Sequence, residues 1–223
     1  FSVDGYVGEA DTQTRLWARD GAPPLIQPGP FLTPIRVKIG GLVLTARDPD
    51  LTWRLGVHYT STSRKDGAQL SVRYPRVTVA PGIGYWKASS AVPGPEIPGT
   101  NSIGNIFLTA GVDWQMGDGW RVASEIASLR QLDTDVGYDA LAGYVALFKR
   151  IGEFTPYVSY AREKSSSDLI GWAKRLRSPS LPAQIPGAST VNAVQRLAGE
   201  NIFAYDQDSI ALGVSYSLSP TAK

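Results

Sequence analysis

The sequence predicts an all-β fold, an antiparallel up-and-down transmembrane β-barrel, of which about 11 strands are visible in this chain. Three observations support this prediction. Apolar and polar residues alternate along many short segments, tight turns join neighbouring segments, and the connections alternate between short and long. A strand protein can span a bilayer only by closing its sheet, because every backbone polar group there needs a partner within the protein.

The alternation is clearest in FLTAGVDWQMGDGWRVASEIAS, residues 107–128, where two alternating runs meet at Gly117-Asp118-Gly119. In LTWRLGVHYTS and DSIALGVSYSLS the apolar residues again occupy every second position. Such a period of two is typical of strands with one apolar and one polar face. The predicted strands are 1–8, 12–19, 35–46, 51–61, 68–79, 83–92, 103–115, 120–131, 139–149, 154–164 and 207–218.

Connection length divides the loops into two sets. Short turns are expected at 9–11, 47–50, 80–82, 116–119 and 150–153, and longer loops at 20–34, 62–67, 90–101, 132–138 and 165–206. Outer-membrane barrels have short turns at one end and long loops at the other. The sequence therefore predicts one barrel domain over residues 1–223, with a long, partly helical loop at 165–206. In that loop SSSDLIGWAKRLRSP is the helical candidate, with Ser167 or Asp168 as its N-cap and Pro179 ending it.

Composition narrows the function classes. Hydrophobic residues make up 43% and charged residues 19% of the chain, and its formal net charge is +2, which gives no indication of nucleic-acid binding. The absence of cysteine excludes zinc-thiolate sites, disulfides and thiol catalysis. No apolar run reaches about 18 residues, so no transmembrane helix is expected. We expect no cofactor and no resident metal.

An aromatic girdle is expected on the lipid-facing side. Indole and phenol rings favour the headgroup level of a bilayer, where the ring is half-buried and the polar atom stays hydrated. Trp114 and Trp120 flank the turn at residues 117–119 on the apolar parity of their strands. The predicted girdle residues are Trp53, Tyr59, Trp114, Trp120 and Tyr216.

The opposite parity predicts the lining of a pore. The residues assigned to it are Arg36, Lys38, Arg54, His58, Arg73, Asp113, Arg121 and Glu125. Lys174, Arg175 and Arg177 are expected to form a constriction loop if residues 165–206 fold inward. Basic residues outnumber acidic ones in this set, and a positively lined passage concentrates anions. The alternative is that the arginines pair with carboxylates across the lumen, which leaves weak selectivity.

Three segments resemble a known family. The hairpin GVDWQMGDGWRVASEIAS, the hairpin GYVALFKRIGEFTPYVSYAR and the segment DQDSIALGVSYSLSPTAK resemble the C-terminal half of porin-like β-barrels from the Gram-negative outer membrane. The resemblance covers residues 103–164 and 206–223. It implies passive diffusion of small hydrophilic solutes through a water-filled barrel without a cofactor, in contact with outer-membrane lipid and lipopolysaccharide, with homo-oligomers left open. Such barrels end in an aromatic residue, whereas this chain ends in Ser219-Pro220-Thr221-Ala222-Lys223, so we expect a strand to be missing.

Two other functions remain open at this point. A soluble β-barrel carrier would turn the same apolar faces inward around a hydrophobic ligand. An outer-membrane hydrolase would use His58, the only histidine, with Ser61 or Ser63 as nucleophile. Asp133 with Asp135 and Asp206 with Asp208 are better explained as solvated loop carboxylates than as calcium ligands.

Overall fold

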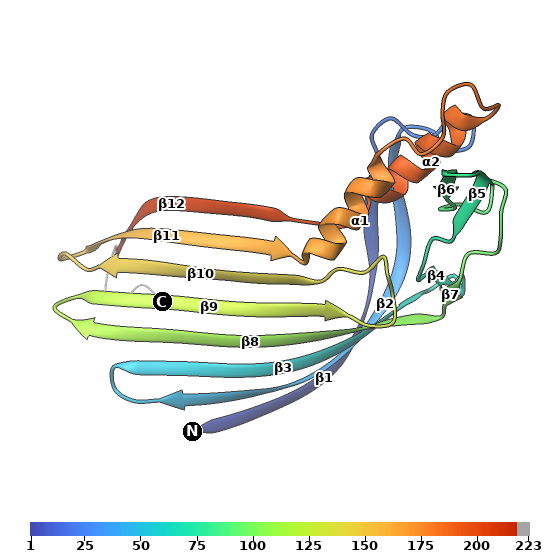
Figure 1. Cartoon of the computed structure of the whole chain (residues 1–223). Coiled ribbons are helices and arrows are strands. Elements are labelled where there is room, and N and C mark those ends of the chain that lie inside the picture. Colours follow the sequence, from blue (N-terminus) through green and yellow to red (C-terminus); the bar gives the residue numbers. More distant parts are fainter. Residues whose placement is uncertain (218–223) are drawn as a thin grey trace.

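The main architectural element is one curved antiparallel sheet. The computed structural model describes residues 1–217, and Leu218 of the last predicted strand and residues 219–223 lie outside that range. Eight strands pair in the order β1-β2-β3-β8-β9-β10-β11-β12 (Figure 1). Their bounds are β1 Ser2–Ala18, β2 Gly29–Arg47, β3 Leu51–Arg64, β8 Ser102–Gly117, β9 Trp120–Gln131, β10 Ala140–Lys149, β11 Phe154–Ser165 and β12 Asp206–Tyr216.

The sheet is not closed into a barrel in this chain, because β1 and β12 form its two edges. It also has eight strands where the sequence predicted about 11. Residues 1–8 and 12–19 belong to a single strand, since the pairing of β1 with β2 runs without interruption from Ser2↔Thr45 to Ala18↔Gly29. The expected turn at 9–11 is absent because Glu9 and Asp11 continue the ladder and form ion pairs with Arg36 on β2.

The predicted strands 68–79 and 83–92 do not join the main sheet. They form β4 Leu70–Ser71, β5 Arg76–Ala80 and β6 Ile83–Trp86, and a further strand, β7 Gly99–Thr100, pairs with β4. β5 and β6 form a hairpin of their own. Pro75, which lacks a backbone N–H, separates β4 from β5 and prevents one long strand.

Connection length sorts by end for the strands of the main sheet, as expected, but the predicted short turn at 80–82 joins β5 to β6 within a long connection. The short turns after β2, β8 and β10 lie together at one end of the sheet, and the long connections lie at the other (Figure 1). At the short-turn end Gly117, Asp118 and Gly119 have φ of 84°, 49° and 75°, the left-handed conformation of a tight hairpin turn. A Cβ on Gly119 would also lie 2.8 Å from the Arg150 carbonyl oxygen, so this position requires glycine.

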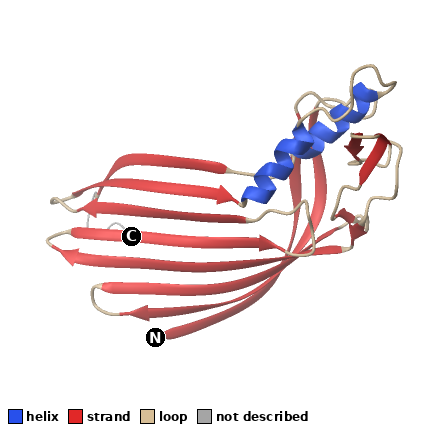
Figure 2. Cartoon of the chain, viewed as in Figure 1, coloured by secondary structure: helices blue, strands red, loops and turns tan. Residues whose placement is uncertain are grey.

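The long connections assemble into a lobe that we call the rim lobe, residues 20–28, 65–101, 132–139 and 166–205. It contains the helices α1 Ser167–Arg177 and α2 Ala188–Glu200 (Figure 2). The helix predicted in this loop is α1, but its N-cap is Ser166 and not Ser167 or Asp168: the Ser166 hydroxyl accepts the Leu169 N–H. α2 was not predicted from the sequence; it begins after Gly187 without a side-chain cap.

Both clusters of buried apolar residues in the described part of the chain lie in the rim lobe. One joins Ala22 to Tyr85, Val92, Leu181, Ala188 and Val194, and the other is formed by Leu169, Ala173, Leu176 and Ile202. α2 therefore packs on the β1–β2 connection, where Arg196 also approaches Asp20 at 3.6 Å. The rim lobe thus links the β11–β12 connection to the first connection of the sheet.

Candidate functional site: the two faces of the sheet

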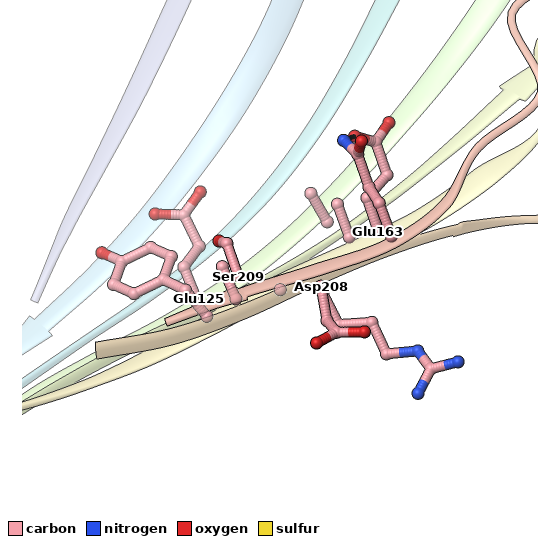
Figure 3. A pocket seen from close by; sticks show the side chains of 11 residues that line it. Glu125, Glu163, Asp208 and Ser209 are labelled. Carbon is pink, nitrogen blue, oxygen red and sulfur yellow. Dashed lines mark hydrogen bonds between the residues drawn. The ribbon is translucent and has the colours of Figure 1, made fainter. Parts of the chain in front are cut away.

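One face of the sheet carries charged and hydroxyl side chains in the middle of its strands, and we call it the polar face. Cross-strand partners point to the same side of a sheet, so the register assigns each residue to a face. One row runs Thr45–Arg54–Gly111–Glu125–Tyr144–Ala161–Ser209. Figure 3 shows Glu125, Glu163 and Ser209 on this side of the strands and Asp208 on the other. The polar face includes Asp4, Tyr6, Arg47, Thr52, Arg54, His58, Arg64, Thr109, Asp113, Arg121, Glu125, Tyr144, Glu163 and Ser209.

A hollow of about 430 Å³ lies on the polar face beside the short-turn end. Arg47, Arg54, Asp113, Arg121 and Glu125 line it. Arg121 donates to Asp113 with an Nε–Oδ1 distance of 2.8 Å, and its guanidinium lies 5.1 Å from the centre of the Phe148 ring. Arg121 is therefore neutralised locally, whereas Arg54 has no ion-pair partner among residues 1–217.

Three residues predicted to line the pore lie elsewhere. Arg36 and Lys38 pair with Ser63 and Ser61 and point to the face opposite Arg54. Both contact Glu9, at 3.0 Å from Arg36 Nε and 3.9 Å from Lys38 Nζ. Arg73 belongs to the rim lobe, where its Nε lies 2.6 Å from Asp135 Oδ2. Arg54, His58, Asp113, Arg121 and Glu125 do share the polar face.

Without Arg36, Lys38 and Arg73, the polar face has no excess of basic residues. On the described strands its formal charges are those of Arg47, Arg54, Arg64 and Arg121 against Asp4, Asp113, Glu125 and Glu163. The basic excess expected from sequence depended on Arg36, Lys38 and Arg73, none of which is there. The balance of four cations and four anions matches the alternative in which arginines are offset by carboxylates.

His58 lies on the polar face away from the serines considered as its partners. Ser61 and Ser63 lie an odd number of positions after His58 on β3, so their side chains point to the opposite face. A nucleophile must lie within hydrogen-bond reach of its base, which this geometry prevents. The groups that lie near the ring are Tyr6, Gly41, Gly56 and Thr109.

The other face carries a continuous apolar belt. Its members are Val3, Val7, Leu42, Leu44, Trp53, Leu55, Val57, Tyr59, Ile106, Leu108, Val112, Trp114, Trp120, Val122, Ile126, Leu141, Val145, Leu147, Phe154, Val158, Tyr160, Ile210, Leu212, Val214 and Tyr216. These side chains do not pack into a sealed core: Leu212 is 78% exposed and Val57 47%. Within the belt all eight strands lack Asp, Glu, Lys, Arg and His. Exposed apolar surface of this extent marks an interaction site.

The apolar belt crosses the strands obliquely. Tyr160 on β11 is connected through Val145, Ser124 and Val112 to Trp53 on β3 by successive register pairs. On β11, Tyr160 is the last residue of the belt, because the next residue on that face is Arg162. On β3, the residue in the same register is Trp53, which lies near the beginning of the belt, and the belt continues to Tyr59. The belt therefore shifts along the strands from one side of the sheet to the other, as it does where strands are tilted by about 35–45° in a membrane barrel.

The predicted girdle residues all lie on this face. Trp53, Trp114, Trp120 and Tyr216 are at the short-turn end, and Tyr59 is at the opposite border of the belt. Phe1 and Phe154 extend the row, with ring centres 6.2 Å from Trp53 and 4.8 Å from Tyr216. Lys149 Nζ lies 4.7 Å from the Trp120 ring, so a cation and an indole meet at this border.

The residues predicted for a constriction loop are on α1 in the rim lobe, at the long-loop end of the sheet (Figure 2). Arg177 donates to the Gly199 carbonyl at 2.9 Å and so ties α1 to α2. Arg175 lies over the Trp172 ring at 5.5 Å, and Lys174 is exposed. None of the three is on the polar face of the sheet.

Comparison of the chain with protein-family models, curated proteins and solved structures finds no match. Neither helix within residues 1–217 has the length and apolar character needed to cross a membrane. In the same residues no three His, Asp or Glu side chains gather as metal ligands would.

Proposed function

We propose that the chain forms part of a porin in the outer membrane of a Gram-negative bacterium and admits small hydrophilic solutes by passive diffusion. The observation that carries the proposal is the apolar belt, an uncharged band on one face of all eight strands, whereas the polar face carries charges at the same level of the sheet. Lipid chains cover the belt, the girdle residues lie at the headgroups, and the polar face lines water. Lipid and lipopolysaccharide are then the partners of the belt.

The free edges fit this proposal. β1 and β12 each present unpaired backbone groups along one side. In hydrocarbon such groups cost several kcal/mol each when unpaired, so a sheet in the bilayer must close. We propose that further strands pair with both edges in the membrane and complete the cylinder that the curved sheet begins.

The polar face favours weak charge selectivity. Its four arginines are offset by four carboxylates, and Arg121 is already paired with Asp113. A wide aqueous passage with balanced charge passes small solutes mainly by size. We therefore propose diffusion of neutral and charged hydrophilic molecules without a marked preference for anions or cations.

Reconstitution into liposomes tests the proposal. The protein should require detergent for extraction, migrate differently on a gel before and after boiling, and make liposomes swell in isotonic sugars at a rate that falls with sugar size. Empty liposomes and boiled protein are the controls. A protein that is soluble without detergent and binds a hydrophobic dye stoichiometrically would instead be a carrier, and the porin proposal would be abandoned.

A further inference from the structure

A cleft in the rim lobe combines arginines with tryptophans and is separate from the polar face. It holds about 520 Å³. Three segments distant in sequence form its walls: residues 73–76 with Trp86, the connection 134–139, and the first two turns of α1. Asp135 N donates to Val72 O at 2.8 Å and Ser166 N to Asp139 O at 3.1 Å, so backbone hydrogen bonds fix the three walls relative to one another.

Two indoles form the apolar part of the cleft. Trp86 and Trp172 meet edge to face with ring centres 4.7 Å apart. Both pack on the cluster of Leu169, Ala173, Leu176 and Ile202, which holds them in place. Tyr74 packs on the same cluster, and burial raises the pKa of its phenol, which keeps it uncharged.

One arginine guanidinium lies over each indole ring. Arg76 Cζ lies 5.1 Å from the centre of the Trp86 ring, and Arg175 Cζ lies 5.5 Å from that of Trp172. Arg175 extends back along α1, where its Nη1 atom is 3.7 Å from the position that a Cβ on Gly171 would occupy. The cation–π contacts place both guanidiniums over the indole rings, while their N–H groups remain available to a ligand.

The charges in the cleft are unequally satisfied. Arg73 is paired with Asp135, Asp139 accepts the Gln131 N–H at 2.9 Å, and Asp168 lies in the first turn of α1, where the helix dipole favours a carboxylate. Arg76 and Arg175 form no ion pair among residues 1–217. The buried indole N–H of Trp172 also has no acceptor in the described part of the chain. Apart from the Asp168 carboxylate at the N-terminus of α1, the cleft groups without an ion pair or hydrogen bond are thus two cations and one neutral donor.

We propose that this cleft binds a small organic carboxylate with a flat apolar body. The carboxylate is held by the forked N–H groups of Arg76 and Arg175, and its body lies against the edges of the two indoles. Arginine favours this planar anion because it can donate two parallel hydrogen bonds to it. The inference does not depend on the porin proposal, since binding to the rim lobe is an equilibrium measurement that needs no membrane transport.

Titration with benzoate tests the cleft in the purified full-length chain. Calorimetry should show saturable binding of benzoate and much weaker binding of benzamide, which keeps the ring without the charge, and of acetate, which keeps the charge without the ring. In a ¹⁵N-labelled sample the indole N–H signal of Trp172, assigned from its loss in Trp172→Phe, should shift with the same saturation curve.

Matched variants separate the cleft from general charge. Arg175→Gln should weaken benzoate binding by about tenfold or more, because a charge-assisted hydrogen bond is lost. Lys174 directly precedes Arg175 on α1 and lies outside the cleft. Lys174→Gln should therefore change the affinity for benzoate by less than about twofold, since an exposed cation contributes little. No saturable binding, equal binding of benzamide and benzoate, or equal effects of the two variants would each overturn the proposal.

Discussion

The Tyr6 hydroxyl on β1 lies 2.6 Å from Nδ1 of His58 on β3, and the two side chains meet above Gly41 of the strand between them. The contact depends on the absence of a side chain at Gly41, where a Cβ would lie 2.5 Å from His58 Nδ1 and 2.9 Å from the Tyr6 hydroxyl. A glycine in the middle strand thus lets residues two strands apart bond across it.

Gly41→Ala should displace the His58 ring and destabilise the sheet by roughly 1–3 kcal/mol, the usual cost of forcing a methyl group into occupied space. Gly40→Ala is the matched control, because its Cβ would meet no atom closer than 3.7 Å. The free energy of unfolding in detergent, measured by urea titration, checks both variants. Equal stability of the two alanine variants would contradict the close approach at Gly41.

If the belt faces lipid as proposed, Leu108→Arg should destabilise the protein in lipid by roughly 2–4 kcal/mol, because it places a charge near the middle of the belt. Its neighbour Thr109 points to the polar face, so Thr109→Arg should cost much less. Folding yield into lipid vesicles and urea unfolding measure the difference. If Thr109→Arg were the more damaging variant, the polar face would be the lipid-facing side, and the proposed assignment of faces would be wrong.

Arg54→Glu combined with Arg121→Glu should move the reversal potential of the pore toward cation selectivity, because each exchange changes the charge of the polar face by two. Arg36→Glu makes the same change on the opposite face and should leave the potential nearly unchanged. Planar-bilayer recordings under a salt gradient measure the shift. An equal shift in Arg36→Glu would place that residue in the ion path.

Gln195→Leu should loosen the rim lobe by about 3 kcal/mol, because the completely buried amide satisfies several groups at once. Its Oε1 accepts from Trp86 N at 2.9 Å, and its Nε2 donates to the carbonyls of Leu176 and Ser178 at 3.1 and 3.0 Å. Limited proteolysis should become faster within residues 166–205. Gln184→Leu, an exposed glutamine of the same connection, should leave the rate unchanged.

Asp66 should titrate well below an ordinary aspartate. Its carboxyl accepts from Arg64 and from the Ala68 N–H, and these contacts lower its pKa to about 2. Because the folded pKa lies below the ordinary 3.8, the stabilisation is complete above that value and is lost as the pH falls toward 2. A carboxyl ¹³C titration measures the pKa, which should return toward 3.8 in Arg64→Gln. An unchanged midpoint would show that Arg64 does not hold the charge.

The faces of most strands could be predicted from sequence, because β3, β8, β9 and β12 alternate cleanly. β2 could not be assigned in this way. Val37, Ile39 and Val43 on one parity and Leu42 and Leu44 on the other are all apolar, and Gly40-Gly41 carries no side chain. Only the pairing with β3 decides which set lies in the apolar belt, and that pairing places Arg36 and Lys38 on the face opposite Arg54.

The rim lobe was hidden for a related reason. Residues 68–92 alternate like a barrel strand, yet the same pattern also suits a small hairpin that packs on helices. α2 has no capping side chain and no charged residue in its first turn, so its start gave no local signal. The cleft between Arg76 and Arg175 joins residues about 100 positions apart, and such a site becomes visible only in the folded chain.

The contact between Asp20 and Arg196 has a consequence for the order of assembly. The two residues are separated by most of the polypeptide, and the Arg19–Glu200 pair beside them spans 181 positions. Hairpins such as β8–β9 pair residues that are close in sequence, so they can form before the later part of the chain is present. The packing of α2 on the β1–β2 connection can form only once the chain is present up to residue 200. An intact Asp20–Arg196 pair therefore indicates that the N-terminal and C-terminal parts of the chain are already in contact.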